Sequence, residues 1–259
     1  MTSMILITVC SFILSFIFAL GGVGSALVLI PTLTWFGVPF SLARPTGLFV
    51  NTVSMTGATF SNIKEKRLDF KLGIPIIISS TIMAPAGAYI GHIMPTKWVM
   101  LCFISFLTFS GFMMLFFKKS KYASQYREDR PVAWPTFVGI IAGFMSGLLG
   151  VGGGGLISPL MILKGFNPKK VATVTAFSVP FSSFSAFVTY AAMGSVSFKI
   201  LIFAGIAAWT GGYMGTKVMH LKLQPETVKR VLACVLLIMA GKLLLSFMFS
   251  GTDFLLPHA

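Results

Sequence analysis

Apolar segments long enough to enter or cross a membrane follow one another along almost the whole chain. Only 10% of the residues are charged, against about 25% in an average soluble domain, so the chain has too little polar surface to fold as a compact body in water. We therefore predict an all-α polytopic membrane protein with roughly 8–10 transmembrane segments in a lipid bilayer. The expected segments are 4–20, 24–37, 44–62, 71–93, 97–117, 135–149, 155–164, 171–193, 197–216 and 227–249.

An internal repeat divides these segments into two groups of five. The glycine-rich stretch 21–24 is followed by Pro31, and the stretch 150–155 is followed by Pro159, with the two copies in register at one constant offset. Such self-similarity indicates two copies of one structural unit. The predicted units are an N-terminal transmembrane repeat at 1–117, a basic cytoplasmic linker at 118–134 and a C-terminal transmembrane repeat at 135–259.

The second segment of each repeat is too short to cross a bilayer comfortably alone. At about 1.5 Å per residue, 24–37 and 155–164 cover roughly 15–21 Å, whereas the hydrocarbon core is about 30 Å thick. We expect each short segment to pair with the segment before it, either as a helical hairpin or as two tilted spans. The glycine-rich stretch between the two segments then forms the turn.

The basic residues indicate how the repeats sit in the membrane. With the short segments paired in this way, most of the 20 Lys and Arg residues lie on one face, and the other face holds Arg44, Lys97 and Lys199. If each short pair instead made one broken span, the basic residues would divide almost evenly, so the positive-inside rule favours the paired arrangement. This arrangement places both termini outside and inserts the repeats with opposite orientations.

Inverted repeats would bring the two glycine-rich turns together near the middle of the bilayer. Irregular backbone at that depth is tolerated where it lines a cavity, and in inverted-repeat transporters such sites bind substrate. Glycines expose backbone N–H groups, and the helix after each turn adds the positive end of its dipole, so the two turns predict an anion site without a formal charge. The alternative is that the glycines only allow close helix packing, but four consecutive glycines at 152–155 exceed what a packing face needs. The candidate substrate-binding residues at the turns are Gly21, Gly22, Gly24, Ser25, Gly152, Gly153, Gly154, Gly155 and Ser158.

The duplicated glycine-rich turn with its downstream proline, together with GAYIG at 87–91 and GGYMG at 211–215, resembles the TauE/SafE family of sulfite and organosulfonate exporters. The similarity spans nearly the whole chain. The resemblance implies movement of small sulfur-containing anions, or related organic anions, across the bacterial cytoplasmic membrane. The positions that carry it are Gly21, Gly22, Gly24, Pro31, Gly150, Gly152, Gly153, Gly154, Gly155 and Pro159.

A second pattern lies in the third segment of the second repeat, where five hydroxylated residues recur at the spacing of one helix face. They predict either a helix-packing face, because small and hydroxylated residues are enriched where membrane helices meet, or hydroxyl donors along a substrate pathway. Asn51 and Ser54, in the corresponding segment of the first repeat, extend the pathway interpretation. The five residues are Thr175, Ser178, Ser182, Ser185 and Thr189, of which Thr175, Ser178 and Ser182 are candidates for substrate binding.

Other functional classes find little support in the sequence. None of the six acidic residues falls within a predicted span, so we expect no carboxylate proton relay and no carboxylate sodium site. The three cysteines lack CxxC or Cys/His spacing, and no nucleophile or acid–base pair has a usable spacing, so we expect no catalytic residues, no metal site and no cofactor. The basic residues fall in loops between apolar segments, so no nucleic-acid partner is expected.

Together these patterns predict a secondary transporter that exports a small anion by alternating access around the paired turns, and the resemblance implies that the anion is of the sulfite or sulfonate type. Two alternatives stay open: a proton-coupled importer of a carboxylate or sulfur anion with the same architecture, and a membrane scaffold that transports nothing. The sequence also leaves open whether the chain forms a homo-oligomer.

Overall fold

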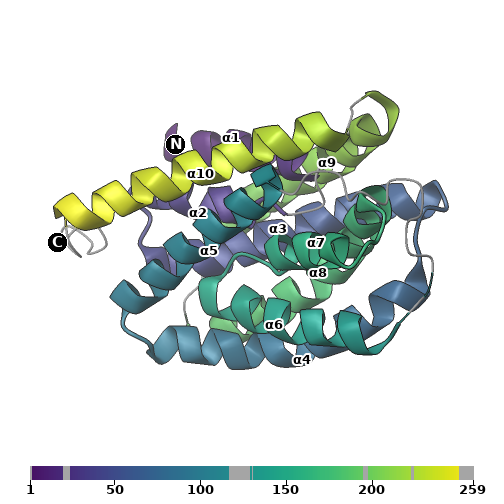
Figure 1. Ribbon diagram of the computed structural model, residues 1–259. Helices are drawn as coiled ribbons and strands as arrows, with labels where there is room; N and C mark the ends of the chain where they lie inside the picture. The colour runs from purple at the N-terminus through teal and green to yellow at the C-terminus, as the bar shows by residue number, and fades with distance from the viewer. Residues whose placement is uncertain are drawn as a thin grey trace.

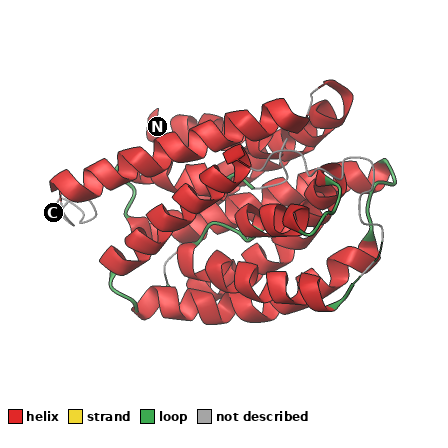
Figure 2. Cartoon of the chain, viewed as in Figure 1, coloured by secondary structure: helices red, strands yellow, loops and turns green. Residues whose placement is uncertain are grey.

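The computed structural model describes residues 2–19, 24–116, 129, 131–194, 198–222 and 225–250, and this described part consists of helices and loops (Figure 1, Figure 2). Each predicted apolar segment is found as a helix, so the all-α prediction is confirmed. The helices are α1 (Thr2–Ala19), α2 (Ala26–Trp35), α3 (Phe40–Lys64), α4 (Phe70–Ile93), α5 (Thr96–Phe116), α6 (Ala133–Leu149), α7 (Gly154–Leu163), α8 (Pro168–Ala192), α9 (Phe198–Lys222) and α10 (Pro225–Ser250). The predicted site residues Gly21 and Gly22 and the linker cations Lys118, Lys119, Lys121, Arg127 and Arg130 lie outside the described residues.

Helix lengths separate spanning from short elements. Within the described residues, three helices, α4, α5 and α8, are long and apolar enough to cross a membrane by length and composition. In contrast, α2 and α7 have 10 residues each, about 15 Å of helix. Lys164 Nζ, just after α7, lies 4.4 Å from the centroid of the Trp134 ring at the start of α6. The chain therefore returns to where α6 began, and α6 and α7 form a hairpin.

The two predicted halves are interleaved. α1 packs mainly against α9 of the second half, and its counterpart α6 packs mainly against α4 of the first half. Gly143 and Gly147 of α6 lie against the backbone of α4, and Gly211 and Gly215 of α9 lie against the backbone of α1, so these glycines allow close helix packing. α3 also contacts α8, and α5 contacts α10, so both halves contribute to one hydrophobic core. The unit boundaries at 118–134 and the inverted orientation of the halves stay predictions.

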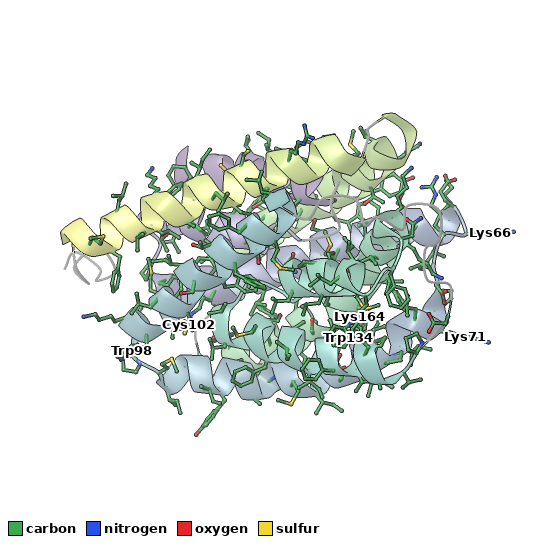
Figure 3. All side chains as sticks on the ribbon, in the orientation of Figure 1. Lys66, Lys71, Trp98, Cys102, Trp134 and Lys164 are labelled. Atoms are coloured by element: carbon green, nitrogen blue, oxygen red, sulfur yellow. The ribbon has the colours of Figure 1, made fainter. Side chains whose placement is uncertain are left out.

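Basic residues gather at one end of the helix bundle. Lys66 after α3 and Lys71 at the start of α4 lie at the right-hand edge of Figure 3, which we call the basic end. Lys164 after α7 lies right of centre, and Trp98 lies at the opposite end. Lys97 precedes Trp98, and Arg44 lies near the start of α3, beside the last turn of α4, so both belong to the opposite end. These residues divide between the two ends as the sequence predicts. Which end faces the cytoplasm stays a prediction.

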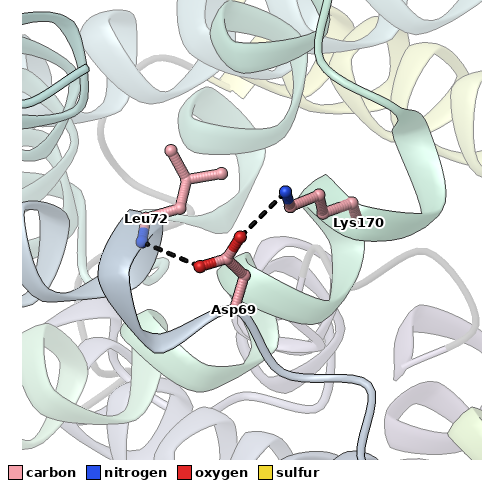
Figure 4. Close-up of polar contacts among 3 residues, drawn as sticks. All are labelled: Asp69, Leu72 and Lys170. Atoms are coloured by element: carbon pink, nitrogen blue, oxygen red, sulfur yellow. Dashed lines mark hydrogen bonds and ion pairs between the residues drawn. The ribbon is translucent and has the colours of Figure 1, made fainter. Parts of the chain in front are cut away.

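An ion pair joins two helices of different halves at the basic end (Figure 4). One carboxylate oxygen of Asp69 accepts a hydrogen bond from the backbone N–H of Leu72 at 3.3 Å and so caps α4. The other oxygen lies 2.8 Å from Lys170 Nζ in α8. Asp69 thereby fixes the start of α4 against the start of α8.

Candidate functional site

The two glycine-rich turns meet at one side chain, the amide of Asn51 on α3. Gly24, before α2, and Gly152, before α7, have φ angles of +93° and +72°, which favour glycine. A Cβ atom at Gly24 would collide with Asn51 Oδ1, and one at Gly152 would collide with Asn51 Nδ2. Glycine is therefore required at both positions for backbone conformation and for contact with Asn51. The described residues of the two turns thus lie together, while their depth in the bilayer and their role as a substrate site stay predictions.

Asn51 lies at the middle of α3, about equally far from both ends of the helix. Its Nδ2 donates a hydrogen bond to Ser183 Oγ of α8 at 3.0 Å, and both side chains are fully buried. Its Oδ1 is buried without a hydrogen-bond partner, which is a costly state for an amide oxygen. A half-turn of the amide would present its two N–H donors to the first turn instead. The centre of the bundle thus holds a polar group whose hydrogen-bonding capacity is only partly used.

The helices that follow the turns begin at this centre without a side-chain cap. Ser25 precedes α2, but its hydroxyl accepts from Ser15 at 3.2 Å instead of capping the helix. Gly153 precedes α7 and has no side chain to offer. A Cβ atom at Gly155 would lie 3.2 Å from Leu27, so the first turns of α2 and α7 lie against each other. Two helix N-termini with partial positive charge therefore adjoin the buried amide, an arrangement suited to an anion.

The remaining predicted site residues surround this centre. Ser54 is buried beside α9, and its hydroxyl has no partner. Ser158 donates to Thr175 at 3.2 Å, which joins α7 to α8. Gly153 packs against α6 and Gly155 against α5, so these two glycines serve helix contacts. The structure thus brings together Gly24, Asn51 and Gly152. It places Ser25 and Gly153 directly before α2 and α7, and it places Ser54, Gly154, Gly155, Ser158 and Thr175 in the surrounding helices.

The hydroxyl stripe of α8 faces α4. Ser178 Oγ donates to the Gly73 carbonyl at 3.5 Å, and Ser185 Oγ donates to the Thr81 carbonyl at 3.0 Å, both on α4. Ser182 donates to a carbonyl of its own helix at 3.1 Å. These bonds favour the helix-packing interpretation of the stripe over a substrate pathway.

Hydroxyls from neighbouring helices also compensate two proline kinks. A proline leaves the carbonyl four residues earlier without its helical N–H donor. Pro85 frees the Thr81 carbonyl, which accepts the α8 hydroxyl just described. Pro180 frees the Ala176 carbonyl, which accepts from Thr59 Oγ1 of α3 at 2.8 Å. The kinks in α4 and α8 are therefore held in place by adjacent helices.

An open groove of ≈ 600 Å³ lies over both kinks, between α3, α4 and α8. Phe181, Phe184 and Val188, which line it, are about half exposed, so the groove opens on the perimeter of the bundle. Asn51 is fully buried and does not line it. We therefore place the candidate site at the turns and not in the groove.

Two residues at this site are not found by the sequence patterns. Ser183 follows Ser182 in the chain, but it points about 100° away from the hydroxyl stripe, so no spacing singles it out. Arg44 is predicted to lie on the opposite, outer face among the loops, yet its side chain is 5% exposed, and its Cβ lies 2.6 Å from where a Cβ at Gly150 would be. No sequence pattern predicts that Arg44 is buried. In the structure it lies inside helix α3, directly before Pro45. Among the described residues, no group of three or more His, Cys, Asp or Glu side chains could hold a metal ion.

The fold and the site together define a class of protein. Short or broken helices that meet at a buried polar centre are a feature of many membrane transporters. The family described as "Sulfite exporter TauE/SafE" matches residues 7–243, and the chain belongs to this family.

Relatives of the chain carry transporter names. The "Probable membrane transporter protein YunE" of Bacillus subtilis (strain 168) is 25% identical, over 96% of this chain and 100% of that protein. The "Probable membrane transporter protein MJ0441" of Methanocaldococcus jannaschii is also 25% identical, over 93% of this chain and 95% of that protein. "Sulfite exporter TauE/SafE family protein 3" of Arabidopsis thaliana is 34% identical over 35% of this chain and 20% of that protein. No solved structure matches the chain significantly.

Proposed function

We propose that this chain exports a small anion of the sulfite or sulfonate type across the cytoplasmic membrane, by alternating access around the two glycine-rich turns. The observation that carries the proposal is the contact of Gly24 and Gly152, one from each half, with the two polar atoms of Asn51. The description of the family and the name of the plant relative support the substrate class.

Neutral donors bind the anion at this centre. They are the first backbone N–H groups of α2 and α7, the hydroxyl of Ser183 and, after a half-turn of its amide, the NH2 group of Asn51. Together they replace the water that a small anion loses on leaving solution. Because Asn51 and Ser183 are fully buried, the anion enters when the turns move apart.

The packing indicates which parts move. The turn at Gly24 belongs to the α1–α2 hairpin, which packs on α9 and α3, whereas the turn at Gly152 belongs to the α6–α7 hairpin, which packs on α4 and α8. Displacement of one hairpin uncovers Asn51 from one side, and displacement of the other uncovers it from the other side. With the halves inserted in opposite orientations, these two openings face opposite sides of the membrane.

The membrane potential supplies the driving force in this proposal. An anion that leaves a cell with a negative interior gains about 2.3 kcal/mol per charge per 100 mV, so export needs no coupled cation. The acidic residues Glu65 and Asp69 lie between α3 and α4, away from Asn51, so they offer no carboxylate for ion coupling at the site.

Efflux of radiolabelled sulfite from proteoliposomes, under an imposed potassium diffusion potential, tests the proposal. We expect efflux to accelerate when the interior is made negative and to be unaffected by a pH gradient. Flux that follows a pH gradient and ignores the potential would support the proton-coupled importer instead. If the wild-type chain moves neither sulfite nor an organic sulfonate, the scaffold alternative stands and the proposal fails.

A pair of matched variants locates the site. Asn51→Ala should abolish sulfite flux, because it removes the side chain that both turns contact. Asn62→Ala removes a second buried amide of α3 near the basic end, away from the turns, and should retain the flux per folded protein. Equal losses in the two variants would argue against a site at the turns.

A further inference from the structure

Arg44 is a buried cation without a carboxylate partner in the described part of the chain. Its Nη1 donates to the carbonyls of Gly91 at 2.8 Å and Leu148 at 3.3 Å, and to Tyr190 Oη at 3.0 Å. Its guanidinium carbon lies 5.1 Å from the centroid of the Phe40 ring and 5.2 Å from that of Tyr190. Its Nε is buried and has no hydrogen-bond partner among the residues that the structure describes. Within the described residues, the groups that contact this positive charge are thus neutral.

A capping role explains part of this arrangement. Gly91 and Leu148 lie in the last turns of α4 and α6, where backbone carbonyls carry partial negative charge. A neutral donor would satisfy the same carbonyls without the cost of burying a full charge. The charge and the unpaired Nε therefore point to an anionic partner that is present only during part of the working cycle.

Arg44 lies on the path between the turns and the end opposite the basic end. It stands seven positions before Asn51 on α3, which is two helical turns, about 10 Å, along the same face. The second glycine-rich turn runs beside both residues, because Gly150 packs against Arg44 and Gly152 against Asn51. At the repeat's constant offset, Arg44 corresponds to Ala172, so the second half carries no matching cation.

We propose that Arg44 is a second anion-binding residue, which receives the oxyanion from the Asn51 site on its way to the opposite end. This inference rests on the proposed function. Oxygens of the anion replace the carbonyls of Gly91 and Leu148 as acceptors, and the buried charge gains the counter-ion that it lacks. The planar fork of a guanidinium binds two oxygens of one group, so the residue selects sulfite, sulfonate or carboxylate groups over halides. Release of the two carbonyls loosens the start of α3 from the ends of α4 and α6.

Sulfite efflux kinetics of charge variants test this assignment. Arg44→Gln should raise the KM for sulfite about tenfold or more, as expected for a lost hydrogen bond to a charged group. Arg44→Lys keeps the charge without the fork and should give an intermediate KM with weaker discrimination against chloride. Lys97→Gln removes an exposed cation from the same end and serves as the matched control, with wild-type KM expected. The assignment is overturned if Arg44→Gln leaves the KM for sulfite at the wild-type value, or if it gives the same KM as the control Lys97→Gln.

Labelling of the wild-type protein keeps the test open if the Arg44 variants do not fold. Proteoliposomes are treated with phenylglyoxal, with and without sulfite, and adducts are located by mass spectrometry. We expect an adduct at Arg44 that sulfite suppresses, and an adduct at the partly exposed Arg67 that sulfite leaves unchanged. An Arg44 adduct that sulfite does not suppress, or no adduct at all, overturns the assignment, because a guanidinium that never meets solvent cannot meet the anion. If the wild-type chain shows no sulfite flux, the proposed function fails and this inference fails with it.

Discussion

Replacement of Thr59 by valine should lower the free energy of unfolding by about 1–2 kcal/mol, although the two side chains have nearly the same shape. The Thr59 hydroxyl donates to the Ala176 carbonyl, which Pro180 deprives of its helical donor. Ala176 is 2% exposed, and lipid offers no donor in place of water. A buried acceptor left unsatisfied costs about 1–3 kcal/mol, and measured hydrogen bonds between membrane helices reach about 0.6–1.7 kcal/mol, which sets the expected range.

A double-mutant cycle with Pro180→Ala isolates this effect. Alanine at 180 restores a backbone N–H for the Ala176 carbonyl, so in that background Thr59→Val should cost less than about 0.5 kcal/mol. Thr56→Val is the matched control: the Thr56 hydroxyl bonds a carbonyl of its own helix at 2.7 Å, and that carbonyl keeps its helical N–H, so little should be lost. Reversible unfolding in mixed micelles, followed by circular dichroism, gives the free energies. An equal cost of Thr59→Val in both backgrounds would refute the reasoning.

Three further predictions concern the turns and the basic end. Gly194→Ala, at φ +80° with no atom within 4 Å of the new Cβ, should lower the free energy of unfolding by about 1–2 kcal/mol in the same assay. Gly152→Ala adds a collision with Asn51, so it should lower the free energy of unfolding further and should abolish sulfite flux. Equal losses of stability in the two variants would contradict the packed turn. Asn51→Asp should also abolish sulfite efflux per folded protein, because a carboxylate at this position repels the anion although the side chain keeps its size; efflux that persists in the Asp variant would speak against an anion site. Asp69→Asn keeps the helix cap but loses the ion pair with Lys170, so it should lower the free energy of unfolding by about 0.2–1 kcal/mol at low salt and by less at high salt. If salt leaves this loss of stability unchanged, the ion pair is not its source.

Much of the fold follows from the sequence because lipid leaves the backbone few alternatives. Without water to satisfy N–H and C=O groups, an apolar segment must be helical, so hydropathy locates the described helices closely. The largest difference is at the end of α9, which continues to Lys222 beyond the predicted end at 216. Hydropathy reports where a segment leaves the apolar layer, and the helix itself continues into the polar region beyond. The meeting of the turns at Gly24 and Gly152 follows from the repeat and the distribution of basic residues.

The site is predicted less completely because spacing along one helix does not name the neighbouring helix. The stripe that contains Ser178 and Ser185 has the spacing of a helix face, but only the packing shows that the face meets α4. Ser183 enters the site because α8 lies beside the middle of α3. Arg44 is buried because the ends of α4, α6 and α8 converge on the start of α3, and no local pattern encodes that convergence.

The exchange of partners between the halves has a consequence for biosynthesis. The main partner of α1 is α9, which the ribosome makes only after helices α2 to α8. Until α9 has been synthesised and inserted, α1 and α2 are therefore covered by lipid or by the insertion machinery. α1 therefore reaches its native packing only once α9 has entered the bilayer.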